Sequence, residues 1–245
     1  ANDFNYNNYT YVAWCWKESA TAGFDIVSYT GNGTDDTDIS HSLSAVPHLM
    51  IVKNRETVEN WAVYHHKVSS DPETDFLKLN TDAAVGDDVN KWSDEAPTSS
   101  VFTVGSSTYT NENTKGMIAY LFSEKQGYSK FGSYIGNGND DGPFVNLGFR
   151  PAFIIIKKTD ATNAWSMLDS TRDTANPLDN LLWANVTDAE DGYSSTATAR
   201  YDFLSNGFKC VTDGSAFNTS GSTYIYMAWA EAPFVNSNGV PCNAR

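Results

Sequence analysis

Four histidines are the side chains of this 245-residue sequence best suited to acid–base chemistry near neutral pH. His65 and His66 are adjacent, and His41 and His48 precede them. No histidine lies near a serine or cysteine in a GxSxG-type nucleophile elbow, and the HExxH spacing of zinc proteases does not occur. We therefore predict no catalytic residue and no metal centre. His65 and His66 remain candidate binding residues.

The 30 acidic residues could supply the carboxylate pair of a glycosidase. In so acidic a chain some pair always falls at a suitable distance, so we interpret these residues as a solvated surface. Two Asp-rich loops, 35–38 and 137–142, carry the oxygen ligands that calcium prefers, although not in EF-hand spacing. Calcium therefore stays an alternative, and equal melting temperatures in EDTA and in excess Ca²⁺ would exclude it.

Tryptophans are the side chains that could stack on sugar rings. Trp61 and Trp165 occupy equivalent positions of an internal repeat, which favours a framework role for both. Trp92 and Trp183 lie in the more divergent stretches. They are therefore the candidate ligand-binding tryptophans.

The internal repeat is visible in the turns and strands that would position these side chains. The segment 28–33 (SYTGNG) recurs as 133–138 (SYIGNG), and both copies run into an Asp-rich stretch. Each copy continues with a proline, an apolar segment, a lysine, a polar turn and a tryptophan. Later, 118–124 (IAYLFSE) aligns with 225–231 (IYMAWAE). Both halves are thus predicted to share one scaffold.

A third fragment, 11–18 (YVAWCWKE), aligns with 224–231. It belongs either to a truncated or processed larger protein, or to a strand exchanged into one of the two sheets. We therefore predict four segments: a terminal strand of a preceding module or an exchanged strand at 1–19, a first repeat at 20–125, a second repeat at 126–236 and a polar tail at 237–245.

The secondary structure is predicted to be almost entirely β. Short β-branched or aromatic segments are bounded by turn residues, as at Leu49 to Lys53 and Phe153 to Lys157. The apolar run 224–229 has no polar face, which suits a strand covered on both faces. Asn206-Gly207 predicts a hairpin, and 176–182 predicts one or two helical turns. The fold class is all-β, with two tandem β-sandwich modules of jelly-roll or concanavalin-like type.

The net charge and the cysteine content exclude several classes of partner and site. A net charge of −14 disfavours nucleic acid and anionic membranes, because both require clustered Lys and Arg. The longest apolar run is too short to span a bilayer. Three cysteines without a CxxC spacing indicate neither a disulfide framework nor a zinc site.

Several motifs resemble one family of virus proteins. The segment 11–17 (YVAWCWK) resembles the end of a concanavalin-like or SPRY-like module in tail-fibre and other virion structural proteins of marine bacteriophages. The segments 22–33 and 128–134 resemble that family's repeat openings, and 142–153 and 201–209 also match it. The resemblance implies a non-enzymatic, virion-associated β-module. It carries no assigned activity.

The leading hypothesis is a virion structural protein (a fibre, appendage or decoration module) that serves particle assembly or host attachment. Its expected location is the surface of the extracellular particle. Its expected partners are other virion proteins, a second copy of the chain in a homo-oligomer and possible host-surface glycans. The alternatives are a carbohydrate-binding module of a secreted bacterial protein and, third, a glycan depolymerase.

Overall fold

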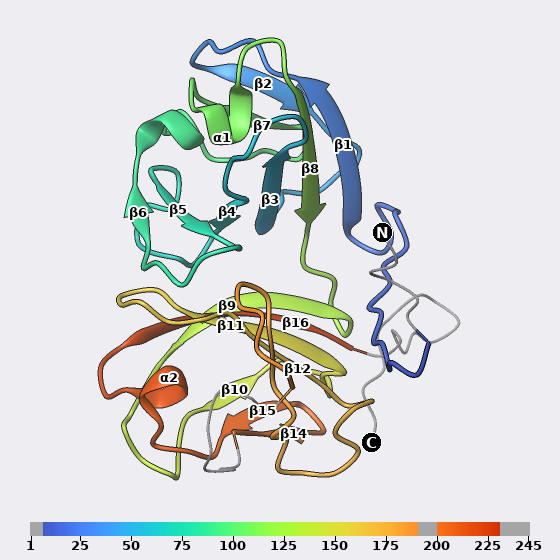
Figure 1. The fold of residues 1–245 in the computed structure, drawn as a ribbon, viewed down its shortest axis with the longest axis vertical. Coiled ribbons are helices and arrows are strands. Elements are labelled where there is room, and N and C mark those ends of the chain that lie inside the picture. Colours follow the sequence, from blue (N-terminus) through green and yellow to red (C-terminus); the bar gives the residue numbers. More distant parts are fainter. Residues whose placement is uncertain (1–6, 191–199, 231–245) are drawn as a thin grey trace.

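The computed structural model describes residues 7–190 and 200–230, and within them the secondary structure is almost entirely β (Figure 1). The elements of the N-terminal half are β1 (Phe24–Thr30), β2 (Thr37–Ser40), β3 (Leu49–Asn54), β4 (Ala62–His65), β5 (Asp75–Lys78), β6 (Gly86–Asp87), the 3-10 helix η1 (Val89–Lys91), β7 (Val101–Val104), α1 (Thr108–Asn111) and β8 (Gly116–Phe122). The elements of the C-terminal half are β9 (Ser129–Ile135), β10 (Phe144–Asn146), β11 (Phe153–Lys158), β12 (Ser166–Asp169), β13 (Leu182–Trp183), β14 (Tyr201–Leu204), β15 (Gly207–Cys210), α2 (Ser215–Asn218) and β16 (Thr223–Trp229). The protein is therefore all-β.

Each half has one large and one small antiparallel sheet. The N-terminal half has a six-stranded sheet in the order β1-β8-β3-β4-β5-β6 and a two-stranded sheet, β2-β7. The C-terminal half has a five-stranded sheet in the order β13-β12-β11-β16-β9 and a three-stranded sheet, β10-β15-β14. The order β1-β8-β3-β4 corresponds to β9-β16-β11-β12. The two large sheets therefore share this strand order.

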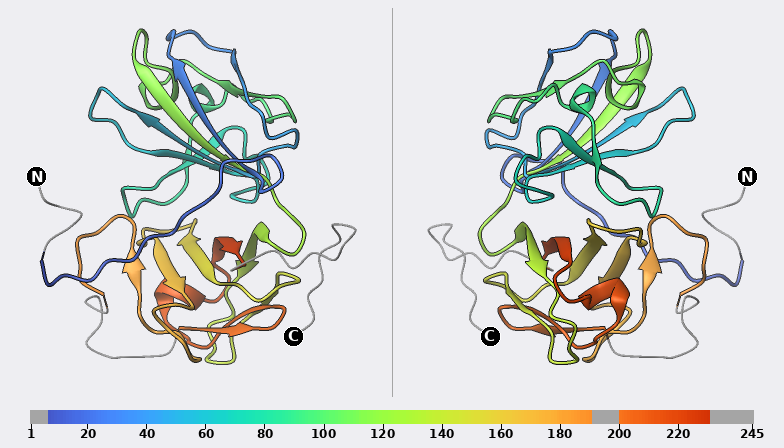
Figure 2. Two further views of the ribbon diagram at one scale, coloured as in Figure 1. Left: turned by 90° about the vertical axis from the view of Figure 1, so that its right-hand side faces the viewer. Right: turned by 90° about the vertical axis from the view of Figure 1, so that its left-hand side faces the viewer.

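The sheets stack in layers, with the two large sheets facing each other in the middle (Figure 2). One apolar cluster fills the space between the six-stranded sheet and β2-β7. A second fills the space between the five-stranded and three-stranded sheets. A third joins the two large sheets. Each large sheet is therefore covered on both faces.

Strand periodicity explains why the central strands lack a polar face. In β3, Leu49 packs in the cluster between the halves, and Met50 packs in the core of the N-terminal half. In β16, Met227 and Trp229 point to the junction, and Ala228 points into the C-terminal core. Because successive side chains of a strand point to opposite faces, a strand covered twice has no position for a polar residue. The predicted double burial of 224–229 is confirmed.

The lysine that ends each central apolar segment caps backbone carbonyls. Lys53 Nζ donates to the carbonyls of Asn54, at 2.7 Å, and Glu59, at 3.0 Å. Lys157 is fully buried, and its Nζ donates to the carbonyl of Lys158 at 2.6 Å. Burial lowers the pKa of Lys157 to about 8. Lys53 thus closes the turn that follows β3, whereas Lys157 binds a carbonyl within β11 itself.

The two Gly-Asn-Gly turns are each fastened by a buried asparagine of a short helix. In the N-terminal half, Asn111 Nδ2 donates to Asn32 Oδ1 at 2.9 Å, and its Oδ1 accepts the Asn32 amide at 2.9 Å. The first glycine is required because a Cβ on Gly31 would lie 2.2 Å from the Glu112 carbonyl oxygen. The second glycine, Gly33, has a backbone φ of +68°, a conformation that residues other than glycine rarely adopt.

Asn218 fastens the turn of the C-terminal half in the same way. Its Nδ2 donates to Asn137 Oδ1 at 2.9 Å and to the Asn139 carbonyl at 2.7 Å, and its Oδ1 accepts the Asn137 amide at 2.7 Å. Gly136 and Gly138 repeat the close approach and the positive φ. The motif that marks the repeat in the sequence is therefore a structural fastening between a turn and a helix.

Replacing Asn218 with alanine is expected to lower the free energy of unfolding by about 3 kcal/mol, because several buried hydrogen bonds are lost and their partners stay desolvated. Urea denaturation followed by circular dichroism measures this loss. Asn113→Ala is the control, since Asn113 is exposed and surface changes cost within about 0.5 kcal/mol. Equal losses in both variants would contradict the fastening role.

Two local predictions need correction. The β14–β15 hairpin exists, but Leu204 pairs with Gly207, so Ser205 and Asn206 form the turn. The predicted helical turns at 176–182 are wrong. There the Asn176 side chain pairs with the backbone of Phe203, which holds the segment beside β14.

The termini of the chain are only partly described. Residues 7–18 contain no strand, and the predicted exchange of 1–19 stays a prediction. The polar tail at 237–245 and Cys242 lie outside the described residues. Cys15 and Cys210 are free thiols. In the described ranges, no helix is long and apolar enough to cross a membrane.

Candidate functional site

The junction between the two large sheets brings together more of the candidate chemistry than any other described region. β3, β4 and β8 face β9, β11 and β16 across it (Figure 1). Leu49, Val63 and Leu77 on one side meet Ile225 and Met227 on the other. The junction is a second hydrophobic core built from both halves.

An aromatic cluster closes one end of the junction. The ring centroids of Trp16 and Trp229 are 5.2 Å apart, those of Phe122 and Trp229 are 5.5 Å apart, and those of Trp16 and Phe122 are 6.0 Å apart. These residues hold corresponding positions in the three aligned segments of the sequence. Trp14 of the N-terminal segment stacks on Phe153 at 4.7 Å. The N-terminal segment therefore contributes two indoles to the core between the halves.

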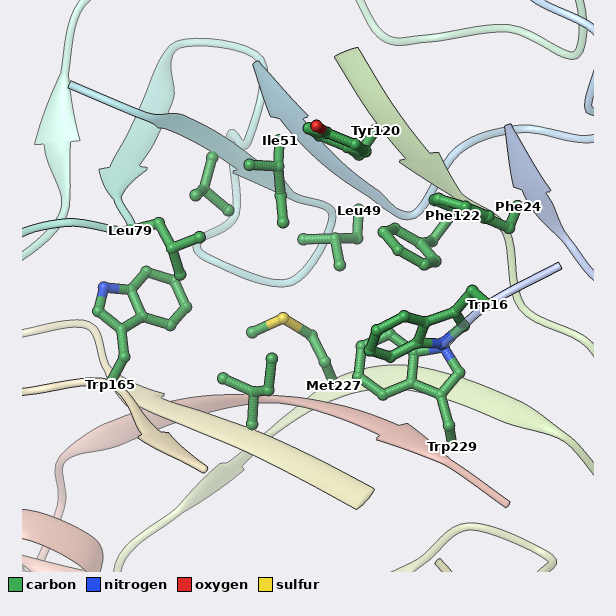
Figure 3. A pocket seen from close by; sticks show the side chains of 12 residues that line it. Trp16, Phe24, Leu49, Ile51, Leu79, Tyr120, Phe122, Trp165, Met227 and Trp229 are labelled. Atoms are coloured by element: carbon green, nitrogen blue, oxygen red, sulfur yellow. The ribbon is translucent and has the colours of Figure 1, made fainter. Parts of the chain in front are cut away.

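A cavity of about 240 Å³ lies beside this cluster, between the two sheets. Twelve residues line it, and only apolar atoms face it (Figure 3). Leu49 and Phe122 approach from the N-terminal half, and Met227 approaches from the C-terminal half. Trp165 and Trp229 bound its two ends.

His65 connects the two halves through a buried hydrogen bond. Its Nε2 lies 3.2 Å from the carbonyl oxygen of Tyr226, and its Nδ1 lies 3.1 Å from the amide of Lys67. A carbonyl accepts and an amide donates, so the network assigns the neutral tautomer with the proton on Nε2. Burial, together with a smaller effect of the neighbouring His66, lowers the pKa of His65 to about 3. His65 is thus a neutral structural side chain at neutral pH.

His66 and His48 form a second contact between the halves beside His65. His66 Nε2 donates to the Phe131 carbonyl at 2.9 Å, and its ring packs edge-on against His48 with centroids 4.6 Å apart. Burial lowers the pKa of both histidines, while Glu124 opposes the change. Glu124 Oε1 accepts the Phe131 amide at 2.9 Å. The predicted pair therefore belongs to a group of three histidines and one glutamate at the junction.

The candidate ligand-binding tryptophans do not meet in one site. Trp92 is fully buried in the N-terminal core, and its Nε1 donates to the Asp75 carbonyl at 3.0 Å. Trp183 is 7% exposed and packs in the C-terminal core. Stacking on a sugar needs an exposed ring face, and neither indole offers one in this structure. Each indole is buried because the stretch that carries it packs against the apolar core of its own half.

The two framework tryptophans differ from one another. Trp165 is fully buried in the junction, and its Nε1 donates to the Lys78 carbonyl of the other half at 2.9 Å. Trp61 is half-buried and stacks on Tyr120 with centroids 6.4 Å apart. The two tryptophans hold equivalent positions in the sequence, but Trp165 is buried in the junction and Trp61 lies at its periphery.

The acidic loops are occupied by their own partners. Asp35 accepts a hydrogen bond from the Ser93 hydroxyl at 2.8 Å, Asp141 pairs with Lys209, and Asp140 accepts the Asp213 amide at 3.1 Å. Within the part of the chain that the structure describes, no group of three or more His, Cys, Asp or Glu could hold a metal ion.

The cavity and the roles of His48 and Glu124 were not identified from the sequence. One signal pointed to the junction, because strands that are apolar on both faces need a second cover. That signal does not say which surface supplies the cover. In this chain the other half supplies it.

Together, the fold and the junction define an all-β protein of stacked antiparallel sheets whose halves share a hydrophobic interface. The chain belongs to a family described as a domain of unknown function (DUF7483), whose model matches residues 1–233. No curated protein and no solved structure matches the chain.

Proposed function

We propose that the chain is a non-enzymatic structural module of a virus particle, displayed at the particle surface for assembly or host attachment. Other virion proteins and further copies of the chain in a homo-oligomer are its proposed partners. The motif resemblance to virion structural proteins suggests the setting. Nucleic acid and anionic membranes do not suit a chain with a net charge of −14.

The observation that carries the proposal is the use of reactive side chains as structural ties. His65 binds the Tyr226 carbonyl, and Trp165 binds the Lys78 carbonyl, each across the junction. Lys157 of the C-terminal half also reaches the Asp82 carbonyl of the N-terminal half at 3.3 Å. Groups that could act as acids, bases or ligands thereby fix one half to the other. Such a rigid arrangement suits a mechanical component.

The surface chemistry agrees with an extracellular, saline setting. Acidic residues exceed basic residues by fourteen. At moderate ionic strength, salt largely screens the repulsion between surface charges that lie more than about 8–10 Å apart. The two Gly-Asn-Gly turns are fastened by buried asparagines, and the turn after β3 is closed by the carbonyl-capping Lys53. Well-fastened loops favour a displayed, long-lived particle protein.

Immunogold negative-stain imaging of particles, with an antibody against this chain, tests the proposal. Labelling at a fixed position on the particle is expected, and antibody adsorbed beforehand with the purified chain is the control. Particles without labelling would contradict the proposal. Specific binding on a glycan array together with unlabelled particles would favour a secreted carbohydrate-binding module.

A further inference from the structure

The cavity at the junction is large for a natively packed interior. Protein cores leave few voids larger than a water molecule, whereas this cavity measures about 240 Å³. An apolar cavity of about 150 Å³ in another protein stays dry and binds benzene. The present cavity therefore has room for a molecule larger than one aromatic ring.

The walls define the chemistry of an occupant. No polar atom faces the cavity, so a water molecule inside would have no hydrogen-bond partner there. A carboxylate or ammonium group would lose its hydration without compensation. Aromatic rings bound the cavity at Trp165 and Trp229, and aliphatic side chains lie between them (Figure 3). An uncharged aromatic hydrocarbon matches both kinds of wall.

The cavity is lined by both buried and partly exposed side chains. Leu49, Val63 and Met227 form its buried floor. Ile51 and Ile155 also line it and are only partly buried. Trp16 of the N-terminal segment, which is partly buried too, stands at one end (Figure 3). The partly exposed side chains mark the side from which a ligand would enter.

We propose that the cavity between the six-stranded and five-stranded sheets is a binding site for a compact, uncharged apolar molecule of about two fused rings. Such a ligand contacts both halves at once and fills the void between them. Ligand sites commonly lie where two structural units meet. The proposal is independent of the virion role, because it rests on the junction alone.

Methyl NMR of the full chain labelled at methionine tests the proposal, with naphthalene as the probe. The sequence has four methionines, so each resonance can be followed. Saturable shifts are expected at Met227, which lines the cavity. Met50 and Met117 pack in the core of the N-terminal half and are the internal controls. The charged analogue 2-naphthoate is expected to leave Met227 unchanged.

Cavity-filling variants supply the second arm. Ile155→Phe and Ile51→Phe place a ring in the cavity from opposite sheets, and each is expected to weaken naphthalene binding at least tenfold. Ile135→Phe makes the same change at an exposed strand position and is expected to leave the affinity unchanged. No saturable shift at Met227, equal shifts at Met50, or equal affinity for 2-naphthoate would each overturn the proposal. These outcomes come from the unaltered chain and so do not depend on whether a variant folds.

Discussion

Trp165→Ala is expected to lower the free energy of unfolding by about 4 kcal/mol, near the upper range for emptying a buried aromatic site. Trp165 is fully buried and bounds the cavity between the two sheets (Figure 3). The substitution removes the indole contacts, enlarges that cavity and deprives the Lys78 carbonyl of its 2.9 Å hydrogen bond. Urea denaturation followed by circular dichroism measures the loss.

Trp61→Ala is the matched control, because Trp61 holds the corresponding position in the N-terminal half. Trp61 is half-buried, and its ring contact is with Tyr120 at the edge of the junction. Its loss is expected to cost about 1 kcal/mol, since the neighbouring surface is already partly hydrated.

Trp165→Phe separates packing from hydrogen bonding. It keeps an aromatic ring and removes the Nε1 donor, so an intermediate cost of about 2 kcal/mol is expected. If Trp61→Ala proved as costly as Trp165→Ala, the assignment of Trp165 as the buried tie between the halves would be wrong.

The sequence predicts the fold class and the central strands well, because burial leaves a direct mark on strand composition. β3 and β11 begin where the apolar segments at Leu49 and Phe153 begin. The double burial of 224–229 followed from the lack of any polar position. The number of covered faces determines whether a strand alternates apolar and polar residues or is apolar throughout. This number can therefore be inferred from the sequence of a single strand.

Long-range contacts explain what the sequence does not predict. Trp92 looked like an exposed ligand candidate, because nothing in its neighbourhood indicates the Tyr64 ring 5.9 Å away. The segment 176–182 was predicted to form helical turns, but the Asn176 amide pairs with the Phe203 backbone. In each case a partner distant in sequence overrides the local preference.

At the candidate site, too, local sequence predicts one part and distant contacts determine the other. Adjacent histidines at 65 and 66 drew attention as a pair, and both lie at the junction. Their role depends on carbonyls of β16 and β9, more than 60 residues along the chain. Sequence spacing therefore identified the residues, whereas only the stacking of the two halves defines what they do.

Lowering the pH from 7 to 5 is expected to destabilise the folded chain through His65 by about 2 kcal/mol. In the unfolded chain a histidine has a pKa of about 6.5, and burial lowers the pKa of His65 in the folded chain to about 3. Between these values the unfolded state binds the additional proton. Stability is therefore fully present above the unfolded pKa and is lost progressively as the pH falls towards 3.

The geometry explains why His65 resists protonation. Its Nε2 already donates to the Tyr226 carbonyl, so the second proton must go to Nδ1, which accepts the Lys67 amide. Protonation replaces that hydrogen bond with a repulsive contact inside the junction. The neighbouring His66 and His48 also lower the pKa of His65. The Lys67 side chain lowers the pKa values of His48 and His66, whereas Glu124 raises them.

His65→Gln isolates this contribution, because glutamine can donate to a carbonyl but does not titrate. The variant is expected to be less stable at pH 7 and to lose less stability between pH 7 and pH 5 than the unaltered chain. His41→Gln is the control, because His41 lies away from the junction and is bound to the Thr98 carbonyl at 3.2 Å; burial also lowers the pKa of His41, so a smaller reduction of the slope is expected there. Urea denaturation at several pH values measures the slopes. An unchanged slope in His65→Gln, or an equal reduction in His41→Gln, would show that acid acts elsewhere than at the junction.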